Sequence, residues 1–272
     1  MTGSPSTCGA VFLACHEAAT SGVLIRRSDK NDKEFHFQNW VADRIEESGF
    51  NVHPPKRNSY PDFALVDRPE GYEVKGLKNP GRHVDFDCNS QIANGIHQDR
   101  SIYYVFGRYP ARTNSNEYAV EDLVICHGDF LNADRTYEHL NKSFAGFGSF
   151  GDIRVRDRKM YIAPTPYSLA EGTEGEFTLI APLGAGCEEN PELTLVGELE
   201  RVESGKVVTE YSFDLRANTL ITKESDNPTA GGEHRFLAFR AKGASDREVR
   251  MKKPKQIPAQ MTWSEVDDYQ ES

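Results

Sequence analysis

Two short segments of this chain are almost wholly apolar, and they constrain the fold more than any other feature. Ser101–Phe106 (SIYYVF) is apolar after its first residue, and Glu121–Cys126 (EDLVIC) ends in four apolar residues. A strand with apolar side chains at both odd and even positions is buried on both faces of its sheet. We therefore expect a central sheet that other elements cover on both sides.

An amphipathic helix is predicted ahead of these strands, over Lys33–Ser48. Phe37, Trp40 and Val41 follow helical spacing, and Gly49 supplies a stop. Its apolar stripe is expected to pack on the sheet.

A β-hairpin is predicted between the helix and the buried strands. Asp62–Asp67 (DFALVD) and Gly71–Leu77 (GYEVKGL) are strand-like, and the residues between them form a good turn. Residues two apart in a strand point the same way, so Glu73 and Lys75 share a face. Antiparallel pairing through the turn would bring Asp62 close to both.

These side chains form a set with a definite chemistry. The carboxylates of Asp62 and Glu73 and the main-chain carbonyl of Val74 are oxygen ligands of the kind that Mg²⁺ or Mn²⁺ takes. An ammonium group from Lys75 would orient a water and stabilise charge on a phosphoryl group. The alternative is an exposed Glu73–Lys75 pair on a surface strand, since the spacing alone is a loose pattern.

With Pro61 directly before Asp62, and Glu73-Val74-Lys75 in the second strand, the chain resembles the PD-(D/E)xK phosphodiesterase superfamily. Within it, the resemblance is to type II restriction endonucleases. It covers roughly residues 33–145. It implies an α/β (α+β) fold with a restriction-endonuclease-like mixed central sheet flanked by helices. The implied core is a helix, the hairpin, two further strands and a helix between them. The order of elements, with a short helix at Thr136–Phe144, broadly fits.

The resemblance also implies an activity and its residues. The reaction would be Mg²⁺-dependent hydrolysis of a phosphodiester in double-stranded DNA, by in-line attack of water. Asp62, Glu73 and the Val74 carbonyl would hold the metal. Lys75 would act as the water-orienting base or as an electrostatic partner.

Many members carry a further Glu or Gln on the first helix, near the metal's water shell. Gln38 lies at the edge of the apolar stripe and is the candidate here, with Glu46 or Glu47 as alternatives. The two glutamates are also ordinary residues for a solvated helix face.

Candidate DNA contacts follow the motif strand and recur near residue 155. Arg can read guanine, Asn and Gln can read adenine, and all three also bind phosphates. A polar loop and a charged edge strand are the structural alternatives. The candidates are Lys78, Arg82, Asn89, Ser90, Gln91, Arg154, Arg156 and Arg158.

The pattern changes after about Pro166. Phe177–Ala181, Leu193–Leu199 and Val207–Leu215 alternate with period two, which is typical of half-exposed antiparallel strands. We expect a nuclease core over residues 1–165. A β-rich C-terminal segment over residues 166–272 would pack on it and serve DNA recognition or dimerisation.

Composition limits the alternatives. A net charge of −10 and a pI near 5.4 argue against coating nucleic acid through bulk charge, although a local basic cleft is compatible with both. The five cysteines form no CxxC pair and suit a reducing compartment. The apolar run at Gly9–Cys15 is too short to span a membrane. These features predict a cytoplasmic protein without a membrane partner.

The sequence thus predicts a sequence-specific, Mg²⁺-dependent type II restriction endonuclease that acts on double-stranded DNA as a homodimer. Two alternatives stay open. One is a structure-specific repair or junction endonuclease with the same chemistry, and the other is a non-catalytic DNA-binding protein.

Overall fold

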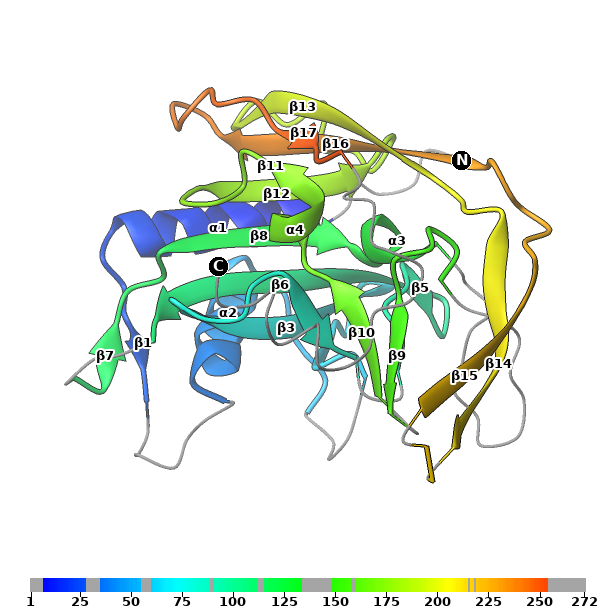
Figure 1. Cartoon of the computed structure of the whole chain (residues 1–272). Helices are drawn as coiled ribbons and strands as arrows, with labels where there is room; N and C mark the ends of the chain where they lie inside the picture. Colours follow the sequence, from blue (N-terminus) through cyan, green and yellow to red (C-terminus); the bar gives the residue numbers. More distant parts are fainter. Residues whose placement is uncertain are drawn as a thin grey trace.

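The computed structural model describes residues 7–27, 35–54, 60–88, 91–111, 115–133, 148–157, 160–214, 216–217 and 219–253. This part of the chain is mixed α+β, with a large mixed sheet and few helices (Figure 1). The coarse fold class expected from the sequence is therefore confirmed.

The helices are α1 (Cys8–Thr20), α2 (Phe35–Glu47), α3 (Gly128–Leu131) and α4 (Pro166–Leu169). The strands of the first half are β1 (Ile25–Arg26), β2 (Phe63–Ala64), β3 (Glu70–Asn79), β4 (Asp85–Asp87), β5 (Ile96–His97), β6 (Arg100–Pro110), β7 (Glu117–Tyr118) and β8 (Asp122–His127). Those of the second half are β9 (Arg154–Asp157), β10 (Met160–Pro164), β11 (Ala170–Glu171), β12 (Phe177–Pro182), β13 (Leu193–Val202), β14 (Lys206–Asp214), β15 (Thr219–Asp226), β16 (Glu233–Ala241) and β17 (Arg250–Met251).

The large sheet has the strand order β13-β16-β12-β8-β6-β3-β2. β3 runs parallel to β6, β6 antiparallel to β8, and β8 parallel to β12. Because β12 pairs directly with β8, one sheet continues across residue 165, where the sequence suggested a boundary. The central strands lie stacked through the middle of the molecule in Figure 1.

The helices α1 and α2 cover one face of this sheet. Their apolar residues form one core with Tyr72 and Val74 of β3 and with the facing residues of the neighbouring strands. Phe37 of α2 lies so close to the sheet that a Cβ on Gly107 would stand 2.1 Å from the Phe37 ring. Only glycine permits this approach, so the sequence fixes where α2 meets β3 and β6.

The opposite face carries a second core. Tyr104 and Phe106 of β6 pack there with Phe86 of β4 and Tyr161 of β10. Strands β4, β10 and β9 form a small antiparallel sheet in this layer. A separate hairpin, β14–β15, extends from the large sheet past β9 and β10 (Figure 1).

Several predicted elements are confirmed. The helix predicted over Lys33–Ser48 is α2, and the apolar segments at Ser101–Phe106 and Glu121–Cys126 are β6 and β8, buried as expected. The first strand of the hairpin is shorter than predicted: β2 ends at Ala64, and Leu65, whose N–H still donates to the Glu70 carbonyl at 3.0 Å, forms a bridge with Val52.

Other elements differ from expectation. The sequence pattern did not predict α1, whose residues are apolar on most sides and therefore lack helical periodicity. β12 was expected to be half-exposed, but Thr178 is buried between β8 and β16. The connector Ser90–Arg100, for which the sequence left a helix open, contains β5 and no helix within residues 91–100. The helix predicted at Thr136–Phe144 lies outside the described residues.

None of the described helices combines the length and the apolar composition needed to cross a membrane.

Candidate active site

The β2–β3 hairpin places Asp62 beside the middle of β3. Phe63 pairs with Tyr72 and Ala64 with Gly71, so Asp62 stands next to Glu73 as predicted. The Pro61 ring lies against the backbone of Gly71. A Cβ atom added to Gly71 would stand 2.5 Å from the Cγ atom of Pro61. The absence of a side chain at Gly71 thus sets the position of the Pro61-Asp62 segment.

Three hydrogen bonds join the predicted site residues. The Val74 N–H donates to Asp62 Oδ2 at 2.8 Å, and the Asp62 N–H donates to Glu73 Oε2 at 3.1 Å. Lys75 Nζ donates to Glu73 Oε1 at 2.6 Å. The Glu73 and Lys75 side chains are only 12% and 26% exposed, which disfavours the alternative of a solvated surface pair.

The main-chain carbonyl of Val74 belongs to the same edge of β3. The N–H and C=O of one strand residue point to the same side of the strand. Because the Val74 N–H reaches Asp62, its carbonyl also points away from β6 and toward the Asp62 side. The three oxygen donors that the sequence predicted therefore lie along one edge.

Burial and the closeness of the two carboxylates make the ionised form of Asp62 less favourable. Burial raises the pKa of Asp62 to about 7, the neighbouring Glu73 carboxylate adds to the rise, and the Val74 N–H and Lys75 oppose it. Burial lowers the pKa of Lys75, but its contacts with Glu73 outweigh burial and leave that pKa above its usual value. Lys75 is therefore a protonated donor, and the site carries excess negative charge.

A divalent cation fits this donor set. Two carboxylates and one carbonyl leave room for the waters that Mg²⁺ retains, and the cation would relieve the repulsion that raises the pKa of Asp62. Within the described residues, no group of three or more His, Cys, Asp or Glu side chains could hold a metal. Any ion at this site thus depends on the carbonyl and on water as well as on the two carboxylates.

Two tyrosines that sequence reasoning missed lie beside the carboxylates. Tyr104 of β6 stands opposite Glu73 in the parallel β3–β6 ladder, and its hydroxyl lies 2.8 Å from that of Tyr60. Burial raises the pKa of Tyr60, and the negative charges of Glu73 and Asp62 add to that rise. No periodicity signals this arrangement, because it depends on the register between β3 and β6.

Gln38 is not brought to these residues. Its helix, α2, packs on the face of β3 that carries Val74 and Gly76, as the contact of Phe37 with Gly76 shows. Glu73 and Lys75 point to the other face by strand alternation. Glu46 and Glu47 lie on the same helix, and Glu47 pairs with Arg44. The structure gives these three residues no contact with the candidate site among the described residues.

Two of the candidate DNA contacts are brought together by the small sheet. Arg82 Nη2 lies 3.1 Å from Asp87, and Arg82 also pairs with Asp85. Arg154 of β9 reaches the same Asp85 at 3.2 Å. Cys88 comes directly after Asp87 in the sequence. Burial raises the pKa of Cys88 to about 12, and the Lys75 ammonium opposes this rise, so Lys75 lies close enough to Cys88 to act on its charge. The two arginines are thus clustered near the site, with their charges paired.

Of the other candidates, the structure describes the side chains of Lys78 and Gln91. Lys78 is exposed and falls on the opposite face of β3 from Lys75 by strand alternation. Gln91 is partly buried and bonds to the backbone of Ile92. The backbone of Arg156 lies in β9, but its side chain is outside the described part. Asn89, Ser90 and Arg158 are also outside the described residues.

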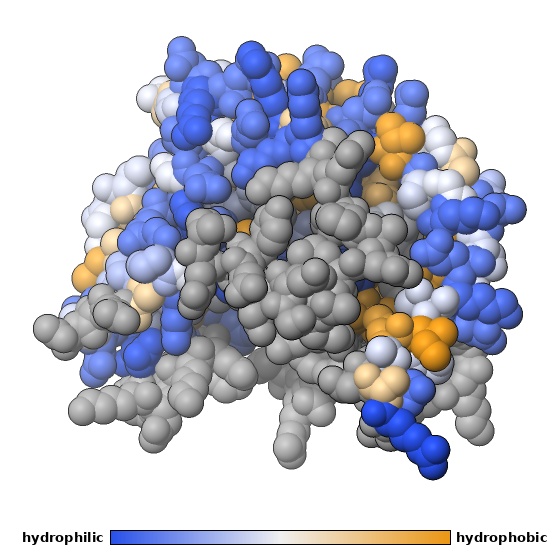
Figure 2. Space-filling view, in the orientation of Figure 1, coloured by the Kyte–Doolittle hydropathy of each residue, from blue (hydrophilic) through white to orange (hydrophobic). Residues whose placement is uncertain are grey.

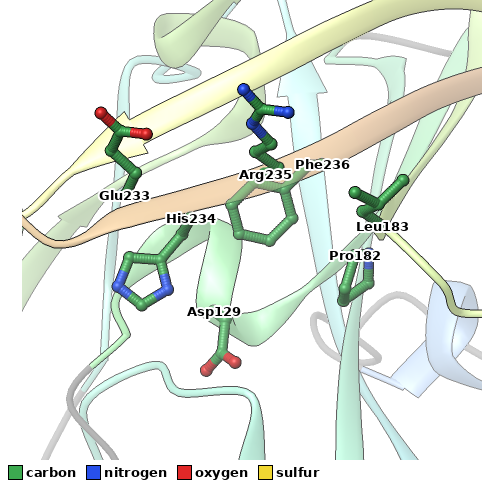
Figure 3. Close-up of a pocket in the computed structure, with 7 residues that line it drawn as sticks. All are labelled: Asp129, Pro182, Leu183, Glu233, His234, Arg235 and Phe236. Atoms are coloured by element: carbon green, nitrogen blue, oxygen red, sulfur yellow. The ribbon is translucent and has the colours of Figure 1, made fainter.

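A pocket of about 360 Å³ lies elsewhere, between α3 and β16 (Figure 3). His234 and Phe236 face Asp129 across it, while Glu233 and Arg235 point away. Two of its polar groups already have protein partners: Asp129 accepts the Gly95 N–H at 2.9 Å. His234 pairs with Glu203 at 2.8 Å. None of the residues predicted from the sequence lines this pocket.

The exposed surface agrees with the acidic, polar composition. Hydrophilic residues predominate over the described part of the face in Figure 2, and hydrophobic ones are scattered among them. Such single apolar residues are normal on a protein surface.

Replacing Gly71 with Ala tests whether the position of Asp62 matters. The new methyl group would displace Pro61, so we expect a stability loss of about 1–3 kcal/mol and a fall in any metal-dependent hydrolysis. Thermal melting and a DNA cleavage assay measure the two effects. Gly205→Ala is the matched control, because an added Cβ there meets no atom within 4 Å. Equal behaviour of the two variants would contradict the packing argument.

Stabilisation by Mg²⁺ should depend on pH. Above the Asp62 pKa of about 7 the carboxylate is charged and can bind the cation, while at pH 5.5 a proton competes. At ten times the dissociation constant, bound metal stabilises the fold by about 1.4 kcal/mol. We therefore expect Mg²⁺ to raise the Tm at pH 8 and much less at pH 5.5. The same rise at both pH values, or in Asp62→Asn, would place the bound ion elsewhere.

No family model matches the chain, and neither the curated proteins nor the solved structures include a match.

Proposed function

We propose that this protein is a Mg²⁺-dependent phosphodiesterase that hydrolyses double-stranded DNA. The observation that supports it is the convergence of Asp62, Glu73 and Lys75, joined by hydrogen bonds on one partly buried edge of β3. The short β2–β3 hairpin holds these three residues together, and the Val74 carbonyl lies on the same side of β3.

The residues of the site would have two different roles, metal binding and electrostatic stabilisation. Asp62, Glu73 and the Val74 carbonyl would hold Mg²⁺, which would lower the pKa of a bound water and polarise the phosphoryl oxygen. Lys75 is held protonated by Glu73, so it fits the role of electrostatic partner and water-orienting donor better than that of a base. Its ammonium offsets charge that develops on the phosphoryl group.

We further propose the restriction type, with a homodimer on a palindromic site. The clustering of Arg82 and Arg154 on the small sheet supports a local DNA contact on an acidic body. Because both arginines share the partner Asp85, DNA phosphates would have to compete with that carboxylate for both guanidinium groups.

Incubation with a mapped plasmid and Mg²⁺ tests this proposal. A restriction enzyme yields discrete fragments from ordinary duplex DNA. A structure-specific nuclease leaves that duplex largely intact and cuts a four-way junction instead. Binding without cleavage of either DNA would favour the non-catalytic alternative.

A further inference from the structure

The Tyr60 and Tyr104 hydroxyls form a hydrogen-bonded pair at the edge of the candidate site. Their oxygen atoms are 2.8 Å apart. Tyr104 is 1% exposed and stands opposite Glu73 in the β3–β6 ladder, whereas Tyr60 is less buried and lies two residues before Asp62. The pair therefore borders both carboxylates, from two different segments of the chain.

A proton count shows what this pair offers. Two phenols carry two O–H protons, and their mutual hydrogen bond uses one. Among the described residues, the structure gives each hydroxyl no hydrogen-bond partner except the other. Burial of Tyr104 favours it as the donor to Tyr60, which leaves the Tyr60 proton without an acceptor among the described residues.

The proposed function places an anion, the phosphodiester, next to this hydroxyl. The Lys75 ammonium also donates to Glu73, so a second, neutral donor would add to the stabilisation that Lys75 gives a phosphate. A phenol is neutral at pH 8 and donates without adding or requiring a counter-charge. Hydrogen bonds to charged acceptors are stronger than neutral ones. The Tyr60 ring is fixed edge-on against His97, with ring centroids 4.9 Å apart, and so is held in place.

We propose that Tyr60 donates a hydrogen bond to a non-bridging oxygen of the phosphodiester to be cut, and that Tyr104 is the positioning residue that orients the Tyr60 hydroxyl. This inference rests on the proposed function and adds a substrate contact to it. The contact involves no bond making or breaking.

Tyr60→Phe removes the hydroxyl and keeps the ring. We expect kcat for DNA cleavage to fall by about tenfold to a hundredfold, as the loss of a hydrogen bond to a charged acceptor gives. Tyr104→Phe should have a smaller effect of the same kind. Tyr211→Phe is the matched control: its hydroxyl lies 3.3 Å from that of Tyr161 in a second tyrosine pair, on β14 and β10. It should cleave as wild type.

Phosphorothioate substrates separate a substrate contact from a structural role. Sulfur is a weak acceptor, so placing it at the oxygen that Tyr60 contacts should slow the wild type and remove most of the difference between wild type and Tyr60→Phe. The other stereoisomer should preserve that difference. Duplex binding in the non-cleaving Asp62→Asn background should also weaken when Tyr60→Phe is added, while thermal melting shows that both proteins are folded.

The outcomes are distinct. Equal slowing of Tyr60→Phe on the natural substrate and both stereoisomers, or no slowing at all, would overturn the inference and leave the proposed function in place. Failure of the wild type to cleave any DNA, or wild-type cleavage by Asp62→Asn, would overturn both.

Discussion

Replacing Asp62 with Asn is expected to abolish metal-dependent DNA cleavage and, at the same time, to stabilise the metal-free protein at pH 8. The carboxylate is a proposed metal ligand, and we expect its loss to reduce cleavage by at least about 100-fold. Asn keeps the size of the side chain and an oxygen that can accept the Val74 N–H. It removes the charge that burial and Glu73 oppose.

The sign of the stability change follows from the pKa. The value of about 7 in the folded protein exceeds the ordinary value of 3.8. Below pH 3.8 Asp62 is protonated in both states and costs nothing. As pH rises to 7, the unfolded state gains more from ionisation, so stability falls. Above pH 7, the full loss of folding stability caused by the buried Asp62 charge is present.

Asp62→Asn should therefore raise the free energy of unfolding by about 1–3 kcal/mol at pH 8 and by little at pH 4. Denaturant titrations at both pH values measure this difference. An Asp62→Asn variant that is inactive and also destabilised at pH 8 would contradict this account. It would show that Asp62 stabilises the fold and that its charge is not a cost to stability.

Replacing Asp122 with Ala is expected to produce the largest loss of stability in the described part of the chain. Asp122 is fully buried, and its carboxylate forms a bidentate pair with Arg108. It also accepts the Tyr167 hydroxyl at 2.9 Å and the Gly175 N–H at 2.6 Å. These bonds join β6, β8, α4 and the turn before β12, so the network ties the two halves of the large sheet together.

Removing Asp122 leaves the buried Arg108 charge with only the partly exposed Glu174 carboxylate at 3.9 Å, which costs about 3–5 kcal/mol. Urea titration should show this loss. Asp226→Ala is the control: its pair with Lys206 is exposed, and its loss should leave stability close to that of the wild type. Similar losses in the two variants would contradict the role given to the Asp122 network.

The sequence predicted the centre of the fold better than its periphery. β6 and β8 were recognisable because apolar residues fill both faces, and α2 because Phe37, Trp40 and Val41 follow helical spacing. The helix α1 was missed because apolar residues occupy most of its sides, including the exposed Ala10, so its sequence carries little helical periodicity. β12 was predicted at the right residues but with one face exposed, whereas Leu179 and Ala181 lie in one core and Ile180 in the other.

The candidate site divides in the same way. Asp62, Glu73 and Lys75 could be predicted because a short hairpin and strand alternation bring them together. The proximity of Tyr104 depends on the parallel register of β3 with β6, and the shared contact of Arg82 and Arg154 with Asp85 depends on β4, β10 and β9. Contacts between segments distant in sequence leave no local pattern. Gln38 was assigned by resemblance, and α2 lies on the other face of β3.

The most direct test of the central claim is a single-turnover cleavage assay on duplex DNA with Mg²⁺, with a chelator, and with the Glu73→Gln variant. Glu73 contacts both Asp62 and Lys75, so the substitution disrupts the whole set while it preserves side-chain size. The account predicts cleavage by the wild type with Mg²⁺ only, and none by Glu73→Gln. Cleavage that persists in chelator, or wild-type rates in Glu73→Gln, would contradict it.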